Sequence, residues 1–320
     1  CELFVYGPGF TYFNSSDTLE EVLAKGSGDF DCIITGHSWL SEKNGQPTYG
    51  VNLDLRASRI PVVGILNKEY NCLDEKLAYF SSNNFVLLFS HHSDIERLSS
   101  KYGLRTIFWP FAVDDDRVLK SSCSRPVDIC FSGILQNIHA GSAHTSSRRQ
   151  VMNKLFYCLG DLPIMKRKEY ATRTIHWNAS PSISTRTDKL IGYRTSRLFF
   201  PRYGYHLHSL NEYFELLGGS KIVINTLSPF DLIGPRNFET MASGGLLLCE
   251  QSDMYKCIFP SSTYATYKPD LSNFNETVDS FLNNELARDR IAQAGKLFVL
   301  AKHKWSDRAT TMLKEIASVI

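Results

Sequence analysis

The chain has 320 residues and a formal net charge of +2, and 43% of its residues are hydrophobic against 21% charged. This composition is typical of a globular protein with a sizeable core and about two domains, and the net charge does not indicate an anionic partner. No apolar run approaches the ~18 residues of a membrane span, and the first residues do not resemble a signal peptide, so we expect no transmembrane segment.

The eight cysteines indicate a reduced, cytoplasmic protein. None of them forms a C-x-x-C pair, the spacing typical of metal sites and redox motifs. Cys32, Cys130 and Cys249 lie in apolar, strand-like runs, where a free cysteine acts as a small hydrophobic residue. We therefore expect no disulfide framework and no bound metal.

The first third of the chain alternates short apolar runs with helical stretches. The predicted strands cover residues 3–6, 29–35, 60–66, 85–90 and 106–109. A capping pattern at residues 16–21 and a stop at Gly26 predict one helix, and Gly103 ends a second helix over residues 95–102. Such alternation favours a parallel α/β sheet with helices on both faces.

Several histidines follow the predicted strands directly. His37, His91 and His92 stand at the carboxyl ends of these strands, where open α/β sheets bind ligands. They are candidates for contact with a transferred group or an acceptor. Alternatively, each is a structural histidine that hydrogen-bonds the backbone at a strand end.

A glycine turn, residues 7–9, follows the first predicted strand. It lacks the third glycine of the dinucleotide-binding fingerprint, and no helix opens there. Gly9 lies either in a tight connection or in a loop that faces a ligand.

The second half begins with a predicted strand over residues 126–131, followed by Gly133, and a helix over residues 150–159 opened by Arg148 and Arg149. Residues 161–208 are rich in basic and aromatic side chains, a mixture found in nucleic-acid-binding proteins and also in loops that face an anionic ligand or a sugar. They contain no RNA- or DNA-binding module, so we expect no nucleic-acid partner.

Residues 221–250 carry the most informative pattern. Residues 222–224 form a short apolar run that predicts a buried strand, and a loop over residues 226–234 follows. Pro235 suits the first position of a helix, and Gly244 ends that helix before a second apolar strand at residues 246–249. The pattern places a helix N-terminus beside the end of a strand.

This arrangement has a chemical use. The first N–H groups of a helix have no intrahelical partner and attract phosphate, and Arg236 adds a cation there. The carboxylate of Glu239, three residues on, suits two adjacent hydroxyls such as those of a ribose. Asp231 in the preceding loop suits hydroxyls of a second sugar, so the set fits a nucleotide-sugar. Alternatively, Glu239 has only a structural role: its negative charge interacts favourably with the positive end of the helix dipole, or it forms an ion pair with Arg236 on the surface.

The segment from Asp231 to Gly245, DLIGPRNFETMASGG, resembles the E-x7-E region of the GT-B glycosyltransferases, with Asp in place of the first acid. Among the group 1 enzymes, the residue pattern of this segment is most similar to that of the CgeB/YkvP-type branch. The resemblance implies that Glu239 binds the ribose of the donor and that Asp231 contacts the donor sugar. We further expect donor binding by Gly9, Gly133, Arg148, Gly234, Pro235, Arg236 and Asn237.

The resemblance also implies an architecture. It consists of two Rossmann-like α/β domains facing a cleft, the first over residues 1–112 on the acceptor side and the second over residues 113–300 on the donor side. The segment WPFAVD, which begins at Trp109, resembles the crossing between them. Residues 301–320 resemble the closing helix that returns to the first domain.

The implied activity is transfer of a hexosyl or pentosyl group from a nucleotide-sugar to an acceptor hydroxyl of a glycan or glycoconjugate. The resemblance implies retention of anomeric configuration, no cofactor and no metal. An inverting enzyme would need a side-chain base, with His37 or His91 as candidates. Two alternatives stay open: a nucleotide-sugar epimerase or hydrolase of the same architecture, and a non-catalytic subunit that binds nucleotide-sugar.

Overall fold

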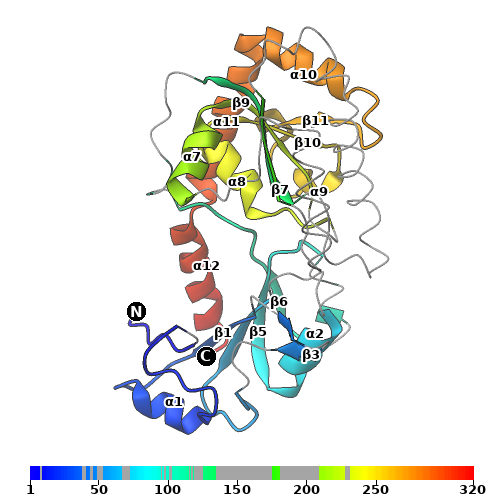
Figure 1. The fold of residues 1–320 in the computed structure, drawn as a ribbon. Coiled ribbons are helices and arrows are strands. Elements are labelled where there is room, and N and C mark those ends of the chain that lie inside the picture. Colours follow the sequence, from blue (N-terminus) through cyan, green and yellow to red (C-terminus); the bar gives the residue numbers. More distant parts are fainter. Residues whose placement is uncertain are drawn as a thin grey trace. The chain divides into compact units, whose positions relative to one another are not determined.

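The chain forms two compact units in the computed structural model. Unit 1 comprises Cys1–Pro110 and Ala309–Ile320, and unit 2 comprises Phe111–Arg308. The structure describes residues 1–7, 9–37, 41–43, 46–48, 53–66, 73–94, 96, 99–100, 103–114, 116, 118, 125–134, 175–180, 209–227 and 231–320. Figure 1 labels the helices and strands of both units.

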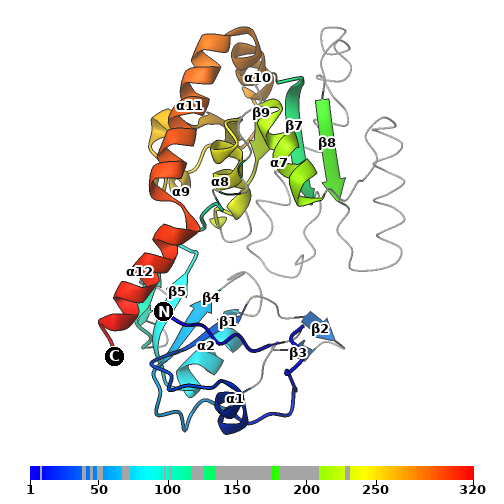
Figure 2. The same ribbon diagram turned by 90° about the vertical axis from the view of Figure 1, so that its left-hand side faces the viewer.

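Unit 1 is built on a parallel sheet with the strand order β1-β4-β5-β6. Its strands are β1 (Ile33–His37), β4 (Val62–Leu66), β5 (Phe85–Ser90) and β6 (Thr106–Phe108), and β2 (Ser41–Lys43) and β3 (Gln46–Thr48) form a separate antiparallel pair. Its helices include α1 (Leu19–Lys25) and α2 (Leu73–Ser82). The parallel sheet confirms the expected fold class for this half (Figure 2).

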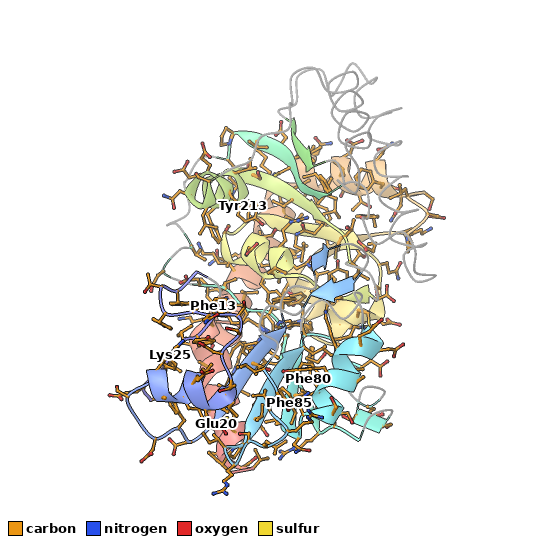
Figure 3. All side chains as sticks on the ribbon, turned by 60° about the horizontal axis from the view of Figure 1, so that its bottom comes forward. Phe13, Glu20, Lys25, Phe80, Phe85 and Tyr213 are labelled. Carbon is orange, nitrogen blue, oxygen red and sulfur yellow. The ribbon has the colours of Figure 1, made fainter. Side chains whose placement is uncertain are left out.

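Apolar side chains of β5 alternate between the two faces of this sheet. Leu88 belongs to the cluster on one face together with Phe80 of α2. Phe89 belongs to the cluster on the other face, together with Met312 and Ile316. These last two residues belong to α12 (Trp305–Ala317), so the C-terminal helix covers unit 1 as the resemblance implies. Phe80, labelled in Figure 3, is fully buried.

The expected first strand at residues 3–6 is wrong. The segment does not pair with any described strand. Phe4 and Tyr6 instead turn inward and pack against each other, and Phe4 also contacts Phe30, while Leu3 and Val5 stay exposed. An apolar tetrapeptide thus buries alternate side chains in a small aromatic cluster without joining the sheet.

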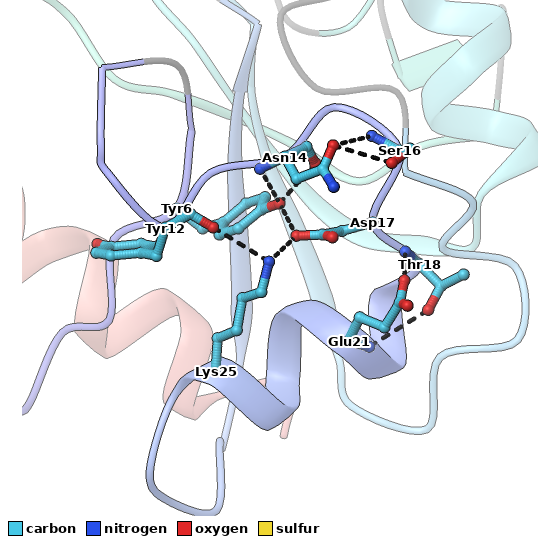
Figure 4. Close-up of polar contacts among 8 residues, drawn as sticks. All are labelled: Tyr6, Tyr12, Asn14, Ser16, Asp17, Thr18, Glu21 and Lys25. Carbon is cyan, nitrogen blue, oxygen red and sulfur yellow. Dashed lines mark hydrogen bonds and ion pairs between the residues drawn. The ribbon is translucent and has the colours of Figure 1, made fainter.

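Polar contacts hold this N-terminal segment on α1 (Figure 4). The Tyr6 hydroxyl and the Lys25 ammonium both donate to the carboxylate of Asp17, which lowers the pKa of that carboxyl, chiefly through Lys25. Thr18 and Glu21 form the expected capping box, because Glu21 accepts from the Thr18 amide at 2.7 Å and Thr18 accepts from the Glu21 amide at 3.3 Å. The predicted start of this helix is therefore confirmed.

Unit 2 contains a five-stranded parallel sheet with the order β11-β10-β9-β7-β8. Its strands are β7 (Val127–Ile134), β8 (Ile175–Ser180), β9 (Ser220–Asn225), β10 (Leu246–Glu250) and β11 (Ala265–Tyr267). The helices in its described part include α7 (Leu210–Gly218), α8 (Pro235–Ala242), α9 (Asp253–Lys256), the 3-10 helix η4 (Ser261–Thr263), α10 (Phe274–Asn283) and α11 (Glu285–Lys302).

Both faces of this sheet are covered. Ile222 and Ile224 of β9 pack in a cluster that includes Val278 of α10. Val223, which points the other way, packs with Leu217 of α7. On that second face, α8 and α9 also cover β10. A parallel sheet with helices on both faces is the Rossmann-like arrangement predicted for this half.

The structure shifts or adds several elements. The second predicted strand begins four residues later than expected, as β1 from Ile33. The elements that were not predicted include α2 and the edge strand β8 (Figure 2). The predicted helix over residues 150–159 lies outside the described residues, as does most of that over residues 95–102.

Candidate active site

The predicted strand, helix and second strand of residues 221–250 are confirmed as β9, α8 and β10, and part of the predicted loop, residues 228–230, lies outside the described residues. β9 and β10 are parallel neighbours, so their carboxyl ends meet at one edge of the sheet. Gly244 has φ +78°, a left-handed conformation that suits glycine and ends α8 as expected. The loop and the start of α8 therefore lie where doubly wound sheets bind ligands.

The N-terminus of α8 has no capping side chain among the described residues. Gly234 is the N-cap and Pro235 occupies the first turn. The carbonyl of Gly234 accepts from both the amide and the side-chain amide of Asn237, at 3.2 and 3.1 Å. The first turn contains no acidic residue to neutralise the positive end of the helix, and Arg236 adds a half-buried cation. This end of α8 can attract an anion.

Asp231 stands out from the loop that leads into α8. Leu232 and Ile233 are buried and anchor the loop, whereas Asp231 is exposed. Its backbone has φ +59°, the left-handed region that aspartate adopts more readily than most residues. The exposed carboxylate therefore lies four residues before α8.

Glu239 lies on α8 one turn after its start, and its side chain is mostly buried. Its Oε2 accepts a hydrogen bond of 2.8 Å from the hydroxyl of Tyr213 on α7. Burial raises the pKa of the Glu239 carboxyl, while the Tyr213 hydrogen bond and the charge of Arg236 act in the opposite direction. Further hydrogen-bond donors, such as the hydroxyls of a ligand, would stabilise this buried carboxylate in its charged form.

Two buried asparagines carry side-chain oxygens that have no partner among the described residues. Asn225 ends β9, and its side-chain nitrogen donates to the hydroxyl of Thr240 at 3.0 Å and to the carbonyl of Arg236 at 3.4 Å. These bonds fasten α8 to the end of β9. The side-chain oxygens of Asn225 and Asn237 lack partners in the described part of the chain, and each is an acceptor for a ligand or water.

Glu250 fixes the other end of the loop. This residue is the last of β10 and is buried, and its Oε1 accepts from the backbone amide of Leu227 at 2.6 Å. Its Oε2 lies 3.5 Å from the hydroxyl of Tyr267. Sequence reasoning missed Glu250, although an acid that ends the apolar run Leu-Leu-Leu-Cys is a visible signal.

The structure brings most of the predicted donor-binding residues of unit 2 together. Gly234, Pro235, Arg236, Asn237 and Glu239 follow one another at the start of α8. We refer below to the α8 site, which consists of Tyr213, Asn225, Asp231, Arg236 and Glu239. Tyr213 and Asn225 were not predicted, because their roles depend on contacts between elements.

Two other predicted residues of this half lie elsewhere. Gly133 does not follow a strand but lies within β7, opposite Ala179 of β8, because the strand continues to Ile134. Arg148 lies outside the described residues.

The remaining predicted residues belong to unit 1. His37 ends β1, and the structure describes only its backbone. His91 follows β5 and is buried, stacked on Trp109 with its Nδ1 2.8 Å from the carbonyl oxygen of the same residue. His92 is also buried, and its Nδ1 accepts from the amide of Asp94 at 3.0 Å. These are contacts of the kind expected of structural histidines at a strand end. Gly9 has φ +103°, in a turn that requires glycine.

In the described part of the chain, no group of three or more His, Cys, Asp or Glu side chains is arranged to hold a metal ion. No helix among the described residues combines the length and apolar character that crossing a membrane demands.

Comparisons with known proteins agree with this architecture. Residues 177–314 match the family described as Glycosyl transferase-like. No curated protein matches the sequence.

Solved structures resemble the fold of most of the chain. Sucrose-phosphate synthase from Thermosynechococcus elongatus is 11% identical with a TM-score of 0.58, over 82% of this chain and 68% of that one. HepE of Anabaena, solved with UDP and glucose, is 10% identical with a TM-score of 0.60, over 81% of this chain and 72% of that one. A glycosyltransferase from Rickettsia africae is 14% identical with a TM-score of 0.57, over 82% and 71%. The chain therefore has the GT-B fold, and its glycosyl transferase-like region contains the whole α8 site.

Proposed function

We propose that the protein is a glycosyltransferase that moves a sugar from a nucleotide-sugar to an acceptor hydroxyl. The observation that carries the proposal is the pairing, on one short helix, of an uncapped N-terminus beside Arg236 with the mostly buried carboxylate of Glu239. The first group suits the diphosphate of such a donor and the second suits its ribose hydroxyls. The match of residues 177–314 to a glycosyl transferase-like family supports the same conclusion.

The reaction breaks the bond between the anomeric carbon and the diphosphate. Positive charge develops on the sugar, and negative charge develops on the leaving phosphate. Backbone amides at the start of α8 and the guanidinium of Arg236 would stabilise that negative charge, and one well-placed donor is typically worth about 3–4 kcal/mol in such a role. With this charge supplied by the protein, the proposed reaction does not need a metal ion.

Asp231 is proposed to contact the transferred sugar, a hexosyl or pentosyl group. Its exposed carboxylate stands on a loop held between Glu250 and the start of α8. We propose a retaining reaction in which the leaving phosphate takes the proton of the acceptor hydroxyl, so that no side-chain base is required. An inverting course would assign that proton to His37 or His91. The resemblance to the CgeB/YkvP-type branch is part of the same proposal.

A panel of nucleotide-sugars tests the function. Wild-type protein is mixed with UDP-, GDP-, dTDP- and CMP-sugars, and its melting temperature is recorded for each. The donor that stabilises the protein is then incubated with a set of glycans, and the products are separated by mass. We expect the nucleotide-sugars of one base to raise the melting temperature. We also expect one acceptor to give a product that is heavier than that acceptor by one sugar residue.

Three results would contradict the proposal. If no member of the panel stabilises the protein, the α8 site does not hold a nucleotide-sugar. If a donor binds but is converted to an isomer or releases free sugar whatever the acceptor, the protein is an epimerase or hydrolase. Binding with no turnover on any acceptor would instead indicate a non-catalytic subunit.

A further inference from the structure

The hydroxyl of Tyr213 is the polar group that reaches Glu239 from another element. Tyr213 lies on α7 and Glu239 on α8, 26 residues apart in sequence, and the two side chains meet at 2.8 Å. Figure 3 labels Tyr213 in this part of unit 2. Both side chains are only partly exposed, so the hydrogen bond lies at the border between the core and the solvent.

Tyr213 is held in place on its own helix. Ser209 and Glu212 form a capping box at the start of α7, with Glu212 accepting from the Ser209 amide at 2.7 Å. Tyr213 also packs against the cluster of Cys130, Leu217 and Val223 under the sheet. This packing and the cap of α7 support the ring in the position from which its hydroxyl meets Glu239.

The direction of this hydrogen bond is defined. Burial, followed by the charge of Glu239, raises the pKa of the Tyr213 hydroxyl well above its ordinary value, so the hydroxyl keeps its proton and donates. Glu239 is the acceptor through Oε2. Its second oxygen, Oε1, has no partner among the described residues, although a carboxylate accepts through both oxygens.

Resting on the proposed function, we infer that Tyr213 is a positioning residue for the donor: it holds Oε2 of Glu239 and so orients the carboxylate for hydroxyls of the nucleotide ribose. Tyr213 does not have to touch the nucleotide. It acts by fixing the rotation of the carboxylate before the ligand arrives, and such preorganisation lowers the cost of binding.

The same hydrogen bond bears on the charge of Glu239. In the described structure, the groups that act on this carboxyl are Tyr213 from α7 and Arg236 from α8, and both favour its ionised form against burial. Cys130 of β7 is buried and its pKa is raised to about 12, so the thiol is neutral. Loss of the Tyr213 hydroxyl therefore raises the pKa of Glu239. The acid limb of nucleotide binding moves to higher pH, which a packing role alone would not cause.

Tyr213→Phe tests the inference, with Tyr264→Phe as the matched control. Tyr264 is a buried tyrosine of the same unit that packs on Tyr255 and Phe259. Affinity for UDP, GDP, dTDP and CMP is measured by calorimetry from pH 5 to 8, and the nucleotide that wild type binds is used throughout. We expect Tyr213→Phe to bind about fivefold more weakly at neutral pH, the size of one hydrogen bond, with an acid limb at higher pH. We expect the control to match wild type.

A Glu239→Ala background makes the test independent of folding losses. If Tyr213 acts through the carboxylate, Tyr213→Phe causes no further loss of affinity once both carboxylate oxygens are absent. Equal losses in both backgrounds, or an unmoved acid limb, would overturn the inference. If wild type itself binds none of the four nucleotides, the proposed function fails instead, so the two failures are distinguishable.

Discussion

The backbone amide of Leu227 donates a 2.6 Å hydrogen bond to the carboxylate of Glu250. Leu227 lies two residues after the end of β9, and Glu250 ends the neighbouring strand β10, 23 residues later. The bond therefore ties the loop to the sheet at the edge where the α8 site lies. Glu250 thus holds the chain four residues before Asp231 and need not touch a ligand.

Replacement of Glu250 by alanine should destabilise the protein. The variant leaves the Leu227 amide without its acceptor, and an unsatisfied buried donor costs about 1–3 kcal/mol. Glu250→Gln retains an acceptor oxygen and should lose less. Urea unfolding followed by circular dichroism measures both. Equal stability of wild type and Glu250→Ala would show that this bond does not hold the loop.

A methyl group at Gly295 should also be harmful, although alanine is the better helix former. Gly295 lies in α11, and an added Cβ would come within 2.6 Å of the carbonyl oxygen of Thr263. We expect Gly295→Ala to lower the free energy of unfolding by about 1–3 kcal/mol, the range for overpacked cores. At Gly218, where the nearest atom lies at 3.8 Å, alanine should be tolerated. A stabilised Gly295→Ala protein would contradict this packing.

The raised pKa of Glu239 predicts a pH-dependent difference in stability. The folded protein holds the proton of this carboxyl more tightly than the unfolded chain, whose reference pKa is 4.5. Its stabilising contribution is thus complete below pH 4.5 and is lost as the pH rises through the folded pKa. Glu239→Gln lacks this titration, so its free energy of unfolding should increase relative to wild type between acidic and neutral pH.

Urea titrations at a series of pH values measure this difference. Glu215→Gln, at an exposed position of the neighbouring helix α7, serves as the control. A Glu239→Gln difference that stays flat with pH would show that burial does not disfavour the charged carboxylate.

Arg236→Ala should specifically weaken the binding of the phosphate groups. Loss of a charge-assisted hydrogen bond costs about 1.5–3 kcal/mol, or about 10- to 100-fold in affinity. The loss should fall on the nucleoside diphosphate and spare the free nucleoside, and added salt should reduce the difference between the variant and wild type. Arg290→Ala removes an exposed arginine of α11 and should bind as wild type does. An equal loss for nucleoside and diphosphate would place Arg236 away from the phosphates.

The arrangement around α8 could be predicted from sequence because its signals are local. Pro235 starts the helix, Gly244 ends it, and the apolar runs on either side form buried strands. The residue types then place a cation and a carboxylate on a single helix. Each of these features depends on neighbours a few positions away.

Contacts between distant segments could not be predicted in this way. Tyr213 and Glu239 are 26 residues apart in sequence, and the pattern of residues in α7 does not show which side chain of another helix the Tyr213 hydroxyl meets. Local sequence patterns also do not predict which strands pair. The apolar segment over residues 3–6 has strand-like composition but pairs with no described strand, whereas β8, in which polar residues alternate with apolar ones, joins the sheet.

The central claim is that Glu239 binds the nucleotide part of a sugar donor. The most direct test titrates the nucleoside diphosphate selected by the panel into wild-type protein and Glu239→Ala by calorimetry, with melting temperature as the check on folding. We predict saturable binding by wild type and a loss of at least about tenfold in Glu239→Ala at near-normal stability. Undiminished affinity in a folded Glu239→Ala protein would contradict the account.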